Sequence, residues 1–450
     1  VVVEKTSNKK TKSSQRAVTA RFIKIQLLSS FCMLKIFLWS FLSVFALFTG
    51  SNYPVLAAGG GYTVTDIQRM GLQANGLLQA VRSQVEIARA EVTSASAFPN
   101  PEVTFMAGPD SKRLPEIDTG PASMQRQVTV SQSLENPFVR RARIGAAEAG
   151  VEASRANLEQ ARADLAAQLR VHIYEFLLRR GLAEMESDIH DLMGEIQRRI
   201  KLSVESGETA RFELIRADTE VMTAASRKEA ALLNTERARI ALLQLTAGAL
   251  PPEFNVTASL GDPVELPSLE ALRVELSTVN PEILRLEAEQ NRAHLRIDQE
   301  RASVLPSVNI LYSNYQDKQF TSNTAGLSVR IPLFYQRRGE VDAAVSDAAR
   351  VRETLDYRRY EINRLLESAW QAMEIARRRV EMFEGGIVKE AEAALRVAEA
   401  AFRLGERGFI EVLDTQRVLR NARSELLQAQ FELQSAAAEI DRLRAHYPKE

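Results

Sequence analysis

The sequence predicts a mainly α-helical protein with a membrane β-barrel, in which one helix–hairpin–long helix repeat occurs twice. Three observations predict this fold class. Very long stretches contain few helix-breaking residues, the second half of the chain repeats the first, and each half contains two short segments of alternating polarity. Only 6% of the 450 residues are aromatic although 45% are hydrophobic, which argues against a single compact globule.

The first 58 residues differ from the rest in charge. They carry eight Lys and Arg residues against Glu4, a net charge of +7, and because the whole chain is neutral the remainder carries about −7. An acidic remainder speaks against a nucleic-acid partner. The apolar run from Ile36 to Phe48 and the small residues near Ala57 and Ala58 predict a secretory signal peptide that is cut at one of these two alanines.

The start of the chain has two further interpretations. We interpret residues 1–32 as an overlong gene start and Met33 as the initiator. A membrane anchor is the alternative to a signal peptide, but the apolar run is shorter than the roughly 20 residues that span a bilayer. Cys32 precedes the cleavage point, so we expect a mature protein without cysteine, disulfide or lipid attachment site.

The mature chain is predicted to be a tandem duplication. We place the first structural repeat at residues 59–266 and the second at residues 267–450. The offset between matching positions is close to 200 residues. The matches are Asn75 with Asn280, Pro101 with Pro306, Leu134 with Leu333, Gly207 with Gly405, Glu213 with Glu411, and Asp218 with Gln416.

Each repeat contains two predicted strands with one apolar and one polar face. The strands cover residues 102–108 and 126–134 in the first repeat, and 307–315 and 325–333 in the second. A proline directly precedes the first strand of each pair, at a position where a missing N–H is tolerated.

A long helix follows each pair of strands, at residues 137–205 and 335–404. Asn136 and the proline after it give the first long helix an N-cap and a favourable first residue. At about 1.5 Å per residue each helix is roughly 100 Å long, and such a helix cannot bury itself.

Four shorter helices are predicted to cover the long ones. Their lengths suggest that helix 209–247 stacks end to end with helix 281–304, and helix 409–446 with helix 76–98. The linking segment 248–268 and the two chain ends would then lie at one common level.

Glycines mark the far end of both long helices. Turns near Gly207 and Gly405 would fold each long helix back on a shorter one, forming two helical hairpins. Gly405 and Gly408 are expected to supply the positive φ that such a turn requires. A single tolerated glycine inside a helix is the alternative, but the break recurs at matching places in both repeats.

Four strands with one apolar face leave two unpaired edges, and a sheet abolishes its edges only by closing. A barrel needs about eight strands or more, so one chain is insufficient, whereas three chains would supply twelve. A small soluble sheet is the alternative, but it would need a core that thin helices do not offer.

Four segments enter and leave the two predicted strand pairs, namely FPNPEVTF, LPSVNI, SLENPFVRRARIGAAEA and IPLFYQRRGEVDAA. With the duplication and the two glycine turns, they make the chain resemble the TolC-type outer membrane efflux proteins, which are exit ducts of tripartite export pumps. The resemblance covers residues 60–446, and the exits from the two hairpins are most similar to the heavy-metal branch of CzcC and CusC. It implies a homotrimer, a 12-stranded barrel in the lipid of the bacterial outer membrane, and an α-helical tunnel in the periplasm. Many relatives carry a lipidated N-terminal cysteine, which this mature chain lacks.

The second turn contains candidate gate residues. Glu411 and Asp414 lie three residues apart on one helix face, so three copies would form stacked carboxylate rings that attract cations. The resemblance implies that Arg407 ties one hairpin to Glu213 on the other and that Phe402 is a gating aromatic. Ordinary solvated charges on a helix are the alternative interpretation, since exposed ion pairs contribute little.

The resemblance also implies the partners. A periplasmic adaptor would dock at the glycine turns of Gly207, Gly405 and Gly408 and connect the duct to an inner-membrane pump of the RND type. The duct would conduct metal cations or small toxic solutes passively, closed at rest by its helical tip and opened when the adaptor and pump dock.

No catalytic or cofactor motif stands out in the sequence. The four histidines are scattered without a second ligand at helical spacing, so we expect neither an enzyme nor a bound metal or cofactor. A periplasmic adaptor or other coiled-coil scaffold is the competing class, although adaptors have one hairpin rather than two. Type I secretion of a protein is the alternative substrate, because the same duct serves both.

Overall fold

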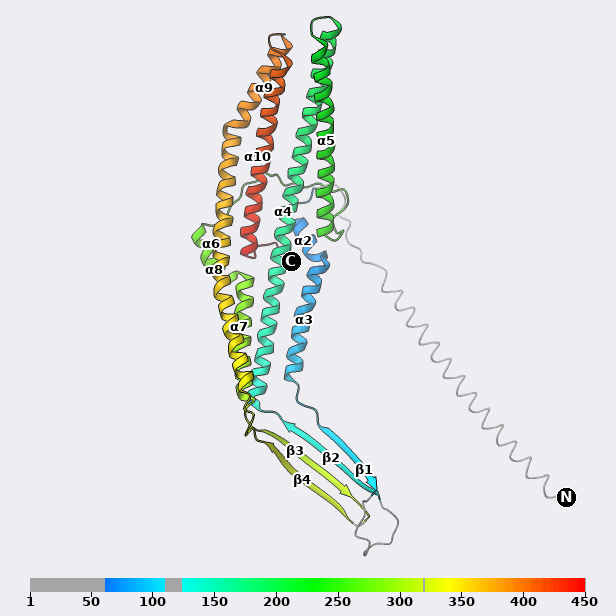
Figure 1. The fold of residues 1–450 in the computed structure, drawn as a ribbon, viewed down its shortest axis with the longest axis vertical. Helices are drawn as coiled ribbons and strands as arrows, with labels where there is room; N and C mark the ends of the chain where they lie inside the picture. The colour runs from blue at the N-terminus through cyan, green and yellow to red at the C-terminus, as the bar shows by residue number, and fades with distance from the viewer. Residues whose placement is uncertain (1–60, 110–123, 319, 450) are drawn as a thin grey trace, which may run out of the picture. The chain divides into compact units, whose positions relative to one another are not determined.

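The computed structural model describes residues 61–109, 124–318 and 320–449. The predicted signal peptide and gene start at residues 1–58 lie outside these residues. Gly61–Glu450 form one compact unit, in which the same order of elements occurs twice (Figure 1). The first half contains α2 (Val64–Ala74), α3 (Gly76–Ser96), β1 (Glu102–Pro109), β2 (Met124–Leu134), α4 (Pro137–Glu205) and α5 (Arg211–Leu245). The second contains α6 (Leu269–Val279), α7 (Pro281–Ala302), β3 (Ser307–Gln316), β4 (Thr321–Arg330), α8 (Arg338–Met382), the π-helical segment η1 (Phe383–Ile387), α9 (Val388–Arg403) and α10 (Phe409–Leu443).

The four strands form one antiparallel sheet in the order β1-β2-β3-β4 (Figure 1). Where the two hairpins meet, Val130 pairs with Tyr312 and Thr129 pairs with Ser313. The apolar residues of both hairpins therefore share one face and the polar residues the other. On the polar face the hydroxyl oxygens of Thr129 and Ser313 are 3.1 Å apart.

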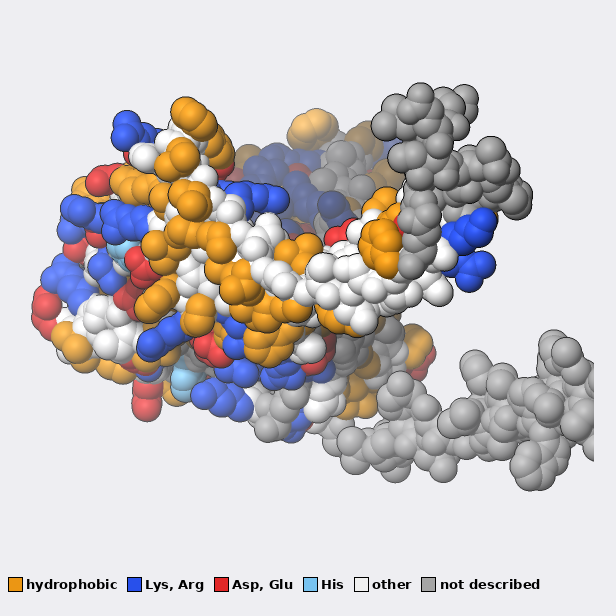
Figure 2. Space-filling view, turned by 90° about the horizontal axis from the view of Figure 1, so that it is seen from below, with side chains coloured by type: hydrophobic (Ala, Val, Ile, Leu, Met, Phe, Trp, Pro, Cys, Tyr) orange, Lys and Arg blue, Asp and Glu red, His pale blue; other side chains and the backbone are white. Residues whose placement is uncertain are grey.

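The apolar face of the sheet is exposed in the single chain. Val103, Phe105, Leu327 and Val329 are each at least half exposed. Figure 2, which views the molecule from the end that carries the sheet, shows hydrophobic side chains gathered in patches between Lys and Arg side chains. Within the described residues, no helix is both long enough and apolar enough to cross a membrane.

Two equivalent asparagines join the ends of helices. The Oδ1 atom of Asn75 accepts hydrogen bonds from the first amides of α3, and its Nδ2 donates to the carbonyl of Leu245 at the end of α5. Asn280 does the same between α7 and the carbonyl of Leu443 at the end of α10, with Nδ2 2.8 Å from that oxygen. Each asparagine therefore satisfies unpaired backbone groups at two helix ends at once.

A third asparagine acts in the same way at the junction of sheet and helices. The Oδ1 atom of Asn136 accepts from the amide of Phe138 in the first turn of α4. Its Nδ2 donates to the carbonyl of Ala302 at the end of α7, at 3.1 Å. The start of one long helix is thus fixed to the end of a helix from the other repeat.

These contacts correct the predicted stacking of the short helices. The sequence predicts that helix 209–247 continues into helix 281–304, and helix 409–446 into helix 76–98. Instead α5 meets the start of α3, and α10 meets the start of α7 (Figure 1). The prediction was wrong because the link after α5 crosses to the other side of α4 before α6 and α7 begin. Lengths alone cannot reveal that crossing.

The two long helices differ from each other. α4 spans 69 residues from Pro137 to Glu205 without interruption, over the range that the sequence predicts. The second stretch, predicted as one helix over 335–404, begins at Arg338 and is interrupted by the π-helical turn Phe383–Ile387. That turn contains Gly385 and Gly386, whose neighbourhood is open. Two adjacent glycines weaken the regular helix, which makes a π-turn less costly there.

Smaller differences concern element ends and two short helices. β4 lies at Thr321–Arg330 rather than at 325–333, because β3 begins at Ser307 and offers no partner beyond Arg330. The sequence analysis missed α2 and α6. A capping box of Thr63 with Asp66 begins α2, and Ser268 caps α6, so local signals for both helices were present.

The C-terminal segment is fixed to α4 by polar contacts. Arg170 of α4 pairs with Asp441 of α10, with Nη1 2.6 Å from Oδ2. The hydroxyl of Tyr447 donates to the carboxylate of Glu159, and burial, together with this acid, raises the pKa of Tyr447. The end of α10 therefore lies at the middle of α4, where the link and α2 also pack.

We predict that Asn280→Ala destabilises the protein by about 2 kcal/mol, because it removes a helix cap and leaves the carbonyl of Leu443 without its buried donor. The apparent midpoint of thermal unfolding in detergent, at a fixed heating rate, measures this loss. Asn291→Ala is the control, since Asn291 is an exposed residue of the same helix. Equal midpoints for the two variants would contradict the joint described here.

Candidate functional site: the paired helical tips

Both helical hairpins end in the same turn. The glycine amide donates to the carbonyl three residues earlier, and the next amide donates to the carbonyl five residues before it, as in a Schellman motif. The glycines adopt positive φ, +86° at Gly207 and +75° at Gly405. The bonds join Gly207 to Val204 and Glu208 to Ser203 in the first turn, and Gly405 to Phe402 and Glu406 to Ala401 in the second.

Gly408 differs from the prediction. We expected it to share the positive φ of Gly405, but its φ is −78° and its ψ 161°. It is the N-cap of α10 and makes no side-chain cap hydrogen bond. Since any residue adopts this extended conformation, the turn itself requires only Gly405 to be glycine.

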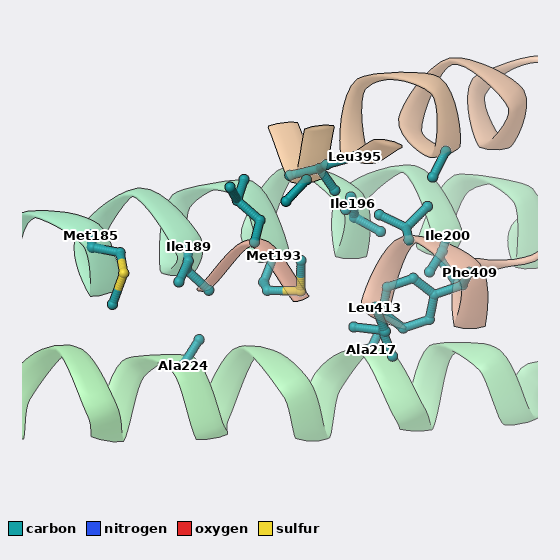
Figure 3. Close-up of a cluster of buried hydrophobic side chains, with 14 of the residues drawn as sticks. Met185, Ile189, Met193, Ile196, Ile200, Ala217, Ala224, Leu395, Phe409 and Leu413 are labelled. Carbon is teal, nitrogen blue, oxygen red and sulfur yellow. The ribbon is translucent and has the colours of Figure 1, made fainter. Parts of the chain in front are cut away.

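One hydrophobic cluster joins the two hairpins near their tips. Its buried residues come from all four helices of the hairpins, α4, α5, α9 and α10. In Figure 3, Phe409 and Leu413 of α10 lie beside Ile200 of α4 and Ala217 of α5. The two hairpins of one chain are therefore held together by burial of apolar surface.

Phe402 belongs to the margin of this cluster. It is partly buried and packs against the cluster, and its ring centroid lies 6.3 Å from that of Phe409. The single chain therefore gives this aromatic a packing partner within its own hairpin.

Each predicted gate acid has an arginine on its own hairpin. Arg407 Nη1 lies 3.0 Å from Glu411 Oε1, and Arg417 Nη1 lies 3.8 Å from Asp414 Oδ1. Glu411 is partly exposed, and Asp414 is more so, with 67% of its side chain accessible. The four charges sum to zero, so the acids act beside two cations rather than alone. These pairs are exposed and each contributes at most about 1 kcal/mol.

Near the tips, ion pairs of Arg417 and Arg420 connect the two hairpins, and the sequence analysis missed both. Arg417 Nη2 lies 2.9 Å from Glu220 Oε1 on α5, and Arg420 Nη1 lies 3.9 Å from Glu186 Oε1 on α4. The contact of Arg417 with Asp414 can be predicted from their three-residue spacing on a helix. The contact of Arg417 with Glu220 cannot be predicted in this way, because the two residues are 197 positions apart in the sequence.

The expected pair of Arg407 and Glu213 does not form within the single chain. Arg407 bonds to Glu411 instead. Glu213 lies in the first turn of α5, and its Oε2 is buried without a hydrogen-bond partner among the described residues. A buried carboxylate oxygen without a donor is costly, so this acid has capacity for a further cation.

Metal coordination has no candidate in the part of the chain that the structure describes. No group of three or more His, Cys, Asp or Glu side chains lies close enough there to hold an ion. His172 instead contacts Glu175, and His190 contacts Asp191.

A family profile described as "Outer membrane efflux protein" matches residues 69–248 and 272–446, once in each half of the chain. The chain belongs to this family. This outer membrane efflux protein is accordingly located in the outer membrane and extends into the periplasm. Its family and fold are those of channel proteins rather than enzymes.

Individual relatives agree with this assignment. The efflux protein is 24% identical over 388 residues to the cobalt-zinc-cadmium resistance protein CzcC of Cupriavidus metallidurans, covering 86% of this chain and 90% of that one. Its fold resembles the solved structure of CusC, with a TM-score of 0.73 and 15% identity. The match covers 87% of this chain and 95% of the CusC chain. It also resembles the open-state structure of the MtrE outer membrane channel of Neisseria gonorrhoeae, with a TM-score of 0.73 and 17% identity. That match covers 86% of this chain and 91% of the MtrE chain. The predicted resemblance to this family and its heavy-metal branch is confirmed.

The two tip glycines of the second hairpin should respond oppositely to one substitution. Gly405→Ser should destabilise the hairpin by about 1 kcal/mol, because a side chain strains the positive φ. Gly408→Ser should be neutral or slightly stabilising, because serine is a good N-cap. Thermal unfolding of the two variants measures the difference. A larger loss from Gly408→Ser than from Gly405→Ser would contradict the assigned geometry.

Proposed function

We propose that three copies of this chain form the exit duct of a tripartite efflux pump, which passively conducts metal cations or small toxic solutes from the periplasm to the outside. The observation that supports this most strongly is that the sheet and the layer of helices each end in two unpaired edges, and that these two edges differ from each other. The sheet ends in β1 on one side and β4 on the other. Unlike edges that pair head to tail form a closed ring when the rotation between successive copies closes.

The sheet has the properties of one third of a barrel wall. One face is apolar and exposed, and the other is polar and cross-linked by side-chain hydrogen bonds. Three copies would supply twelve strands and abolish the free edges. Apolar residues would then face lipid and polar residues the lumen.

The helical layer has the same arrangement. α4 packs against α3 and α5 on one side and against α7 and α10 on the other, and α8 continues the layer beyond α7 and α10. The outer helices α5, α8 and α9 therefore have unpaired sides. They carry exposed apolar side chains that a neighbouring copy would cover. These are Phe212, Ile215, Met222, Leu233 and Ile240 on α5, and Tyr357, Tyr360, Ile375, Met382 and Val397 on α8 and α9.

A metal cargo is supported by the relatives and by the tip charges. CzcC is named for resistance to cobalt, zinc and cadmium. Glu411 and Asp414 would form two carboxylate rings at the narrow end, and carboxylate rings favour cations. Arg407 and Arg417 beside them reduce the negative potential, so cation preference should be moderate and should rise when these arginines are removed.

The tip would form the resting gate. We infer that Glu213, whose Oε2 has no hydrogen-bond partner among the described residues, receives Arg407 of a neighbouring copy in the closed trimer. Arg417 and Glu220 would hold the two hairpins of one copy together. Phe402 would narrow the passage from the margin of the tip cluster.

The proposed partners are a periplasmic adaptor, which would dock at Gly207, Gly405 and Gly408, and an inner-membrane pump of the RND type, which would supply the energy. The two Schellman turns support this docking, because they present exposed backbone with open space around the glycines. A coiled-coil scaffold is not favoured, since the family match covers both hairpins.

The duct itself is tested by deleting the gene and by planar-bilayer recording. Deletion should sensitise the host to divalent metal cations, and the purified protein should give discrete conductance steps with cation preference. Normal metal and solute tolerance together with silent bilayers would contradict the proposal.

The gate is tested by Arg407→Ala and Arg417→Ala, each recorded in planar bilayers. Because an exposed pair contributes under about 1 kcal/mol, we expect the open probability to rise by up to about fivefold. Arg396→Ala on α9 is the control, since its pair with Glu392 is long and exposed. If one of these variants has the same open probability as the wild type, the substituted arginine does not contribute to the gate.

Adaptor docking is tested by comparing Gly405→Leu with Gly405→Ala. Both variants strain the positive φ, but only leucine adds bulk to the docking surface. Export should be lost in the leucine variant and retained in the alanine variant, with trimers in both. Full resistance in cells that carry Gly405→Leu would refute docking at this turn.

A further inference from the structure

A groove of about 530 Å³ lies beside the first turns of α4, where the sheet joins the helices. Its apolar lining includes Phe98, Ile144 and Leu295, which come from the segment before β1, from α4 and from α7. Its charged lining includes Arg140, Arg141 and Glu148. The groove therefore combines an apolar floor with charges of both signs.

Two of these charges have no partner. Within residues 61–109, 124–318 and 320–449, Arg141 and Glu148 are both exposed and each makes no hydrogen bond or ion pair. They lie seven residues apart on one face of α4, about 10 Å along the helix, which is too far for a direct pair. Other arginines and acids of α4, such as Arg155 with Glu152, do pair with each other.

The remaining arginine is fixed in place. Arg140 Nη2 donates to the carbonyl of Ser96 at 2.6 Å, and its guanidinium carbon lies 4.3 Å from the ring centroid of Phe98. Its Nε is shielded from solvent and has no acceptor among the described residues. Arg141 thus offers unused donors at one end of the groove, and the fixed guanidinium of Arg140 adds a positive charge beside it.

We propose that this groove binds one phosphatidylethanolamine molecule of the periplasmic leaflet. The phosphate would accept hydrogen bonds from Arg141 and Arg140, which suit phosphate geometry. The ammonium group would reach Glu148, so the zwitterionic headgroup bridges the two unpaired charges. The acyl chains would lie against Phe98, Ile144 and Leu295 and continue along the apolar face of the sheet. This proposal rests on the proposed function, which places the sheet in the membrane.

The position of the groove is compatible with the trimer. It lies across the start of α4, which is an inner helix of the layer, between α3 and α7, rather than at the outer sides of α3 and α8, which form the open edges at this level. Edge-to-edge closure would therefore leave the groove open. A volume of this size is within the range of small-molecule sites.

Native mass spectrometry of the detergent-solubilised protein, titrated with short-chain lipids, tests the proposal. Wild type should bind one phosphatidylethanolamine per chain. Arg141→Gln should weaken binding about tenfold, the usual effect of losing one charged hydrogen bond. Arg155→Gln is the matched control, because this arginine lies on the same face of α4 fourteen residues further on, about 21 Å from Arg141 along the helix.

Glu148 separates headgroup recognition from charge alone. Glu148→Gln should weaken binding of phosphatidylethanolamine but not of phosphatidylglycerol, which lacks the ammonium group. Inorganic phosphate should not displace the lipid, because it cannot use the apolar floor.

Three outcomes would overturn the proposal: unchanged binding in Arg141→Gln, an equal loss in Arg155→Gln, or full displacement by inorganic phosphate. Conductance of the same preparations reports on the duct separately. Silent bilayers with intact lipid binding would contradict the duct and leave the lipid site standing.

Discussion

The structure depends on asparagines that each serve two helix ends. Asn75 and Asn280 cap one helix with Oδ1 and hold the last carbonyl of another with Nδ2. Backbone groups at a helix end need partners, and a joint between two ends would otherwise bury several of them unpaired. With these joints, two pairs of short helices act as two long columns that run beside α4. Each repeat builds one of these columns by itself, because each of the two asparagines and the helix ends it binds come from the same half of the chain. Asn136 then joins the two halves, since it caps α4 and binds the carbonyl of Ala302 at the end of α7.

The two columns cover α4 on both sides and leave the outer edges of the helical layer unpaired. α4 is covered on both sides, whereas the outer sides of α5, α8 and α9 expose apolar residues and the sheet ends in two unpaired strands. A single chain therefore buries only part of the surface that its sequence makes apolar. Closing the wall with further copies is the arrangement that satisfies the helical layer and the sheet together.

Much of the fold follows from local sequence, and the remainder depends on contacts that local sequence does not contain. The Asn136-Pro137 start and the Gly207 turn predict the bounds of α4 because they set helix ends directly. The stacking of the short helices was predicted wrongly, since length is compatible with either pairing. The turns at the tip glycines could be predicted because glycines recur at matching positions of the two repeats. The pair of Arg417 with Glu220 could not, because it depends on how two hairpins that are distant in sequence pack together.

The central claim is that the unlike edges of this chain pair with each other and close at three copies. Cysteines in place of Phe105 on β1 and Leu327 on β4, joined by a flexible bis-maleimide in outer-membrane fractions, test it directly. The account predicts cross-linked species of two and three chains and none larger, with the single-cysteine variants yielding at most dimers. Absence of cross-links in the double variant, or a ladder that continues beyond three chains, would contradict it.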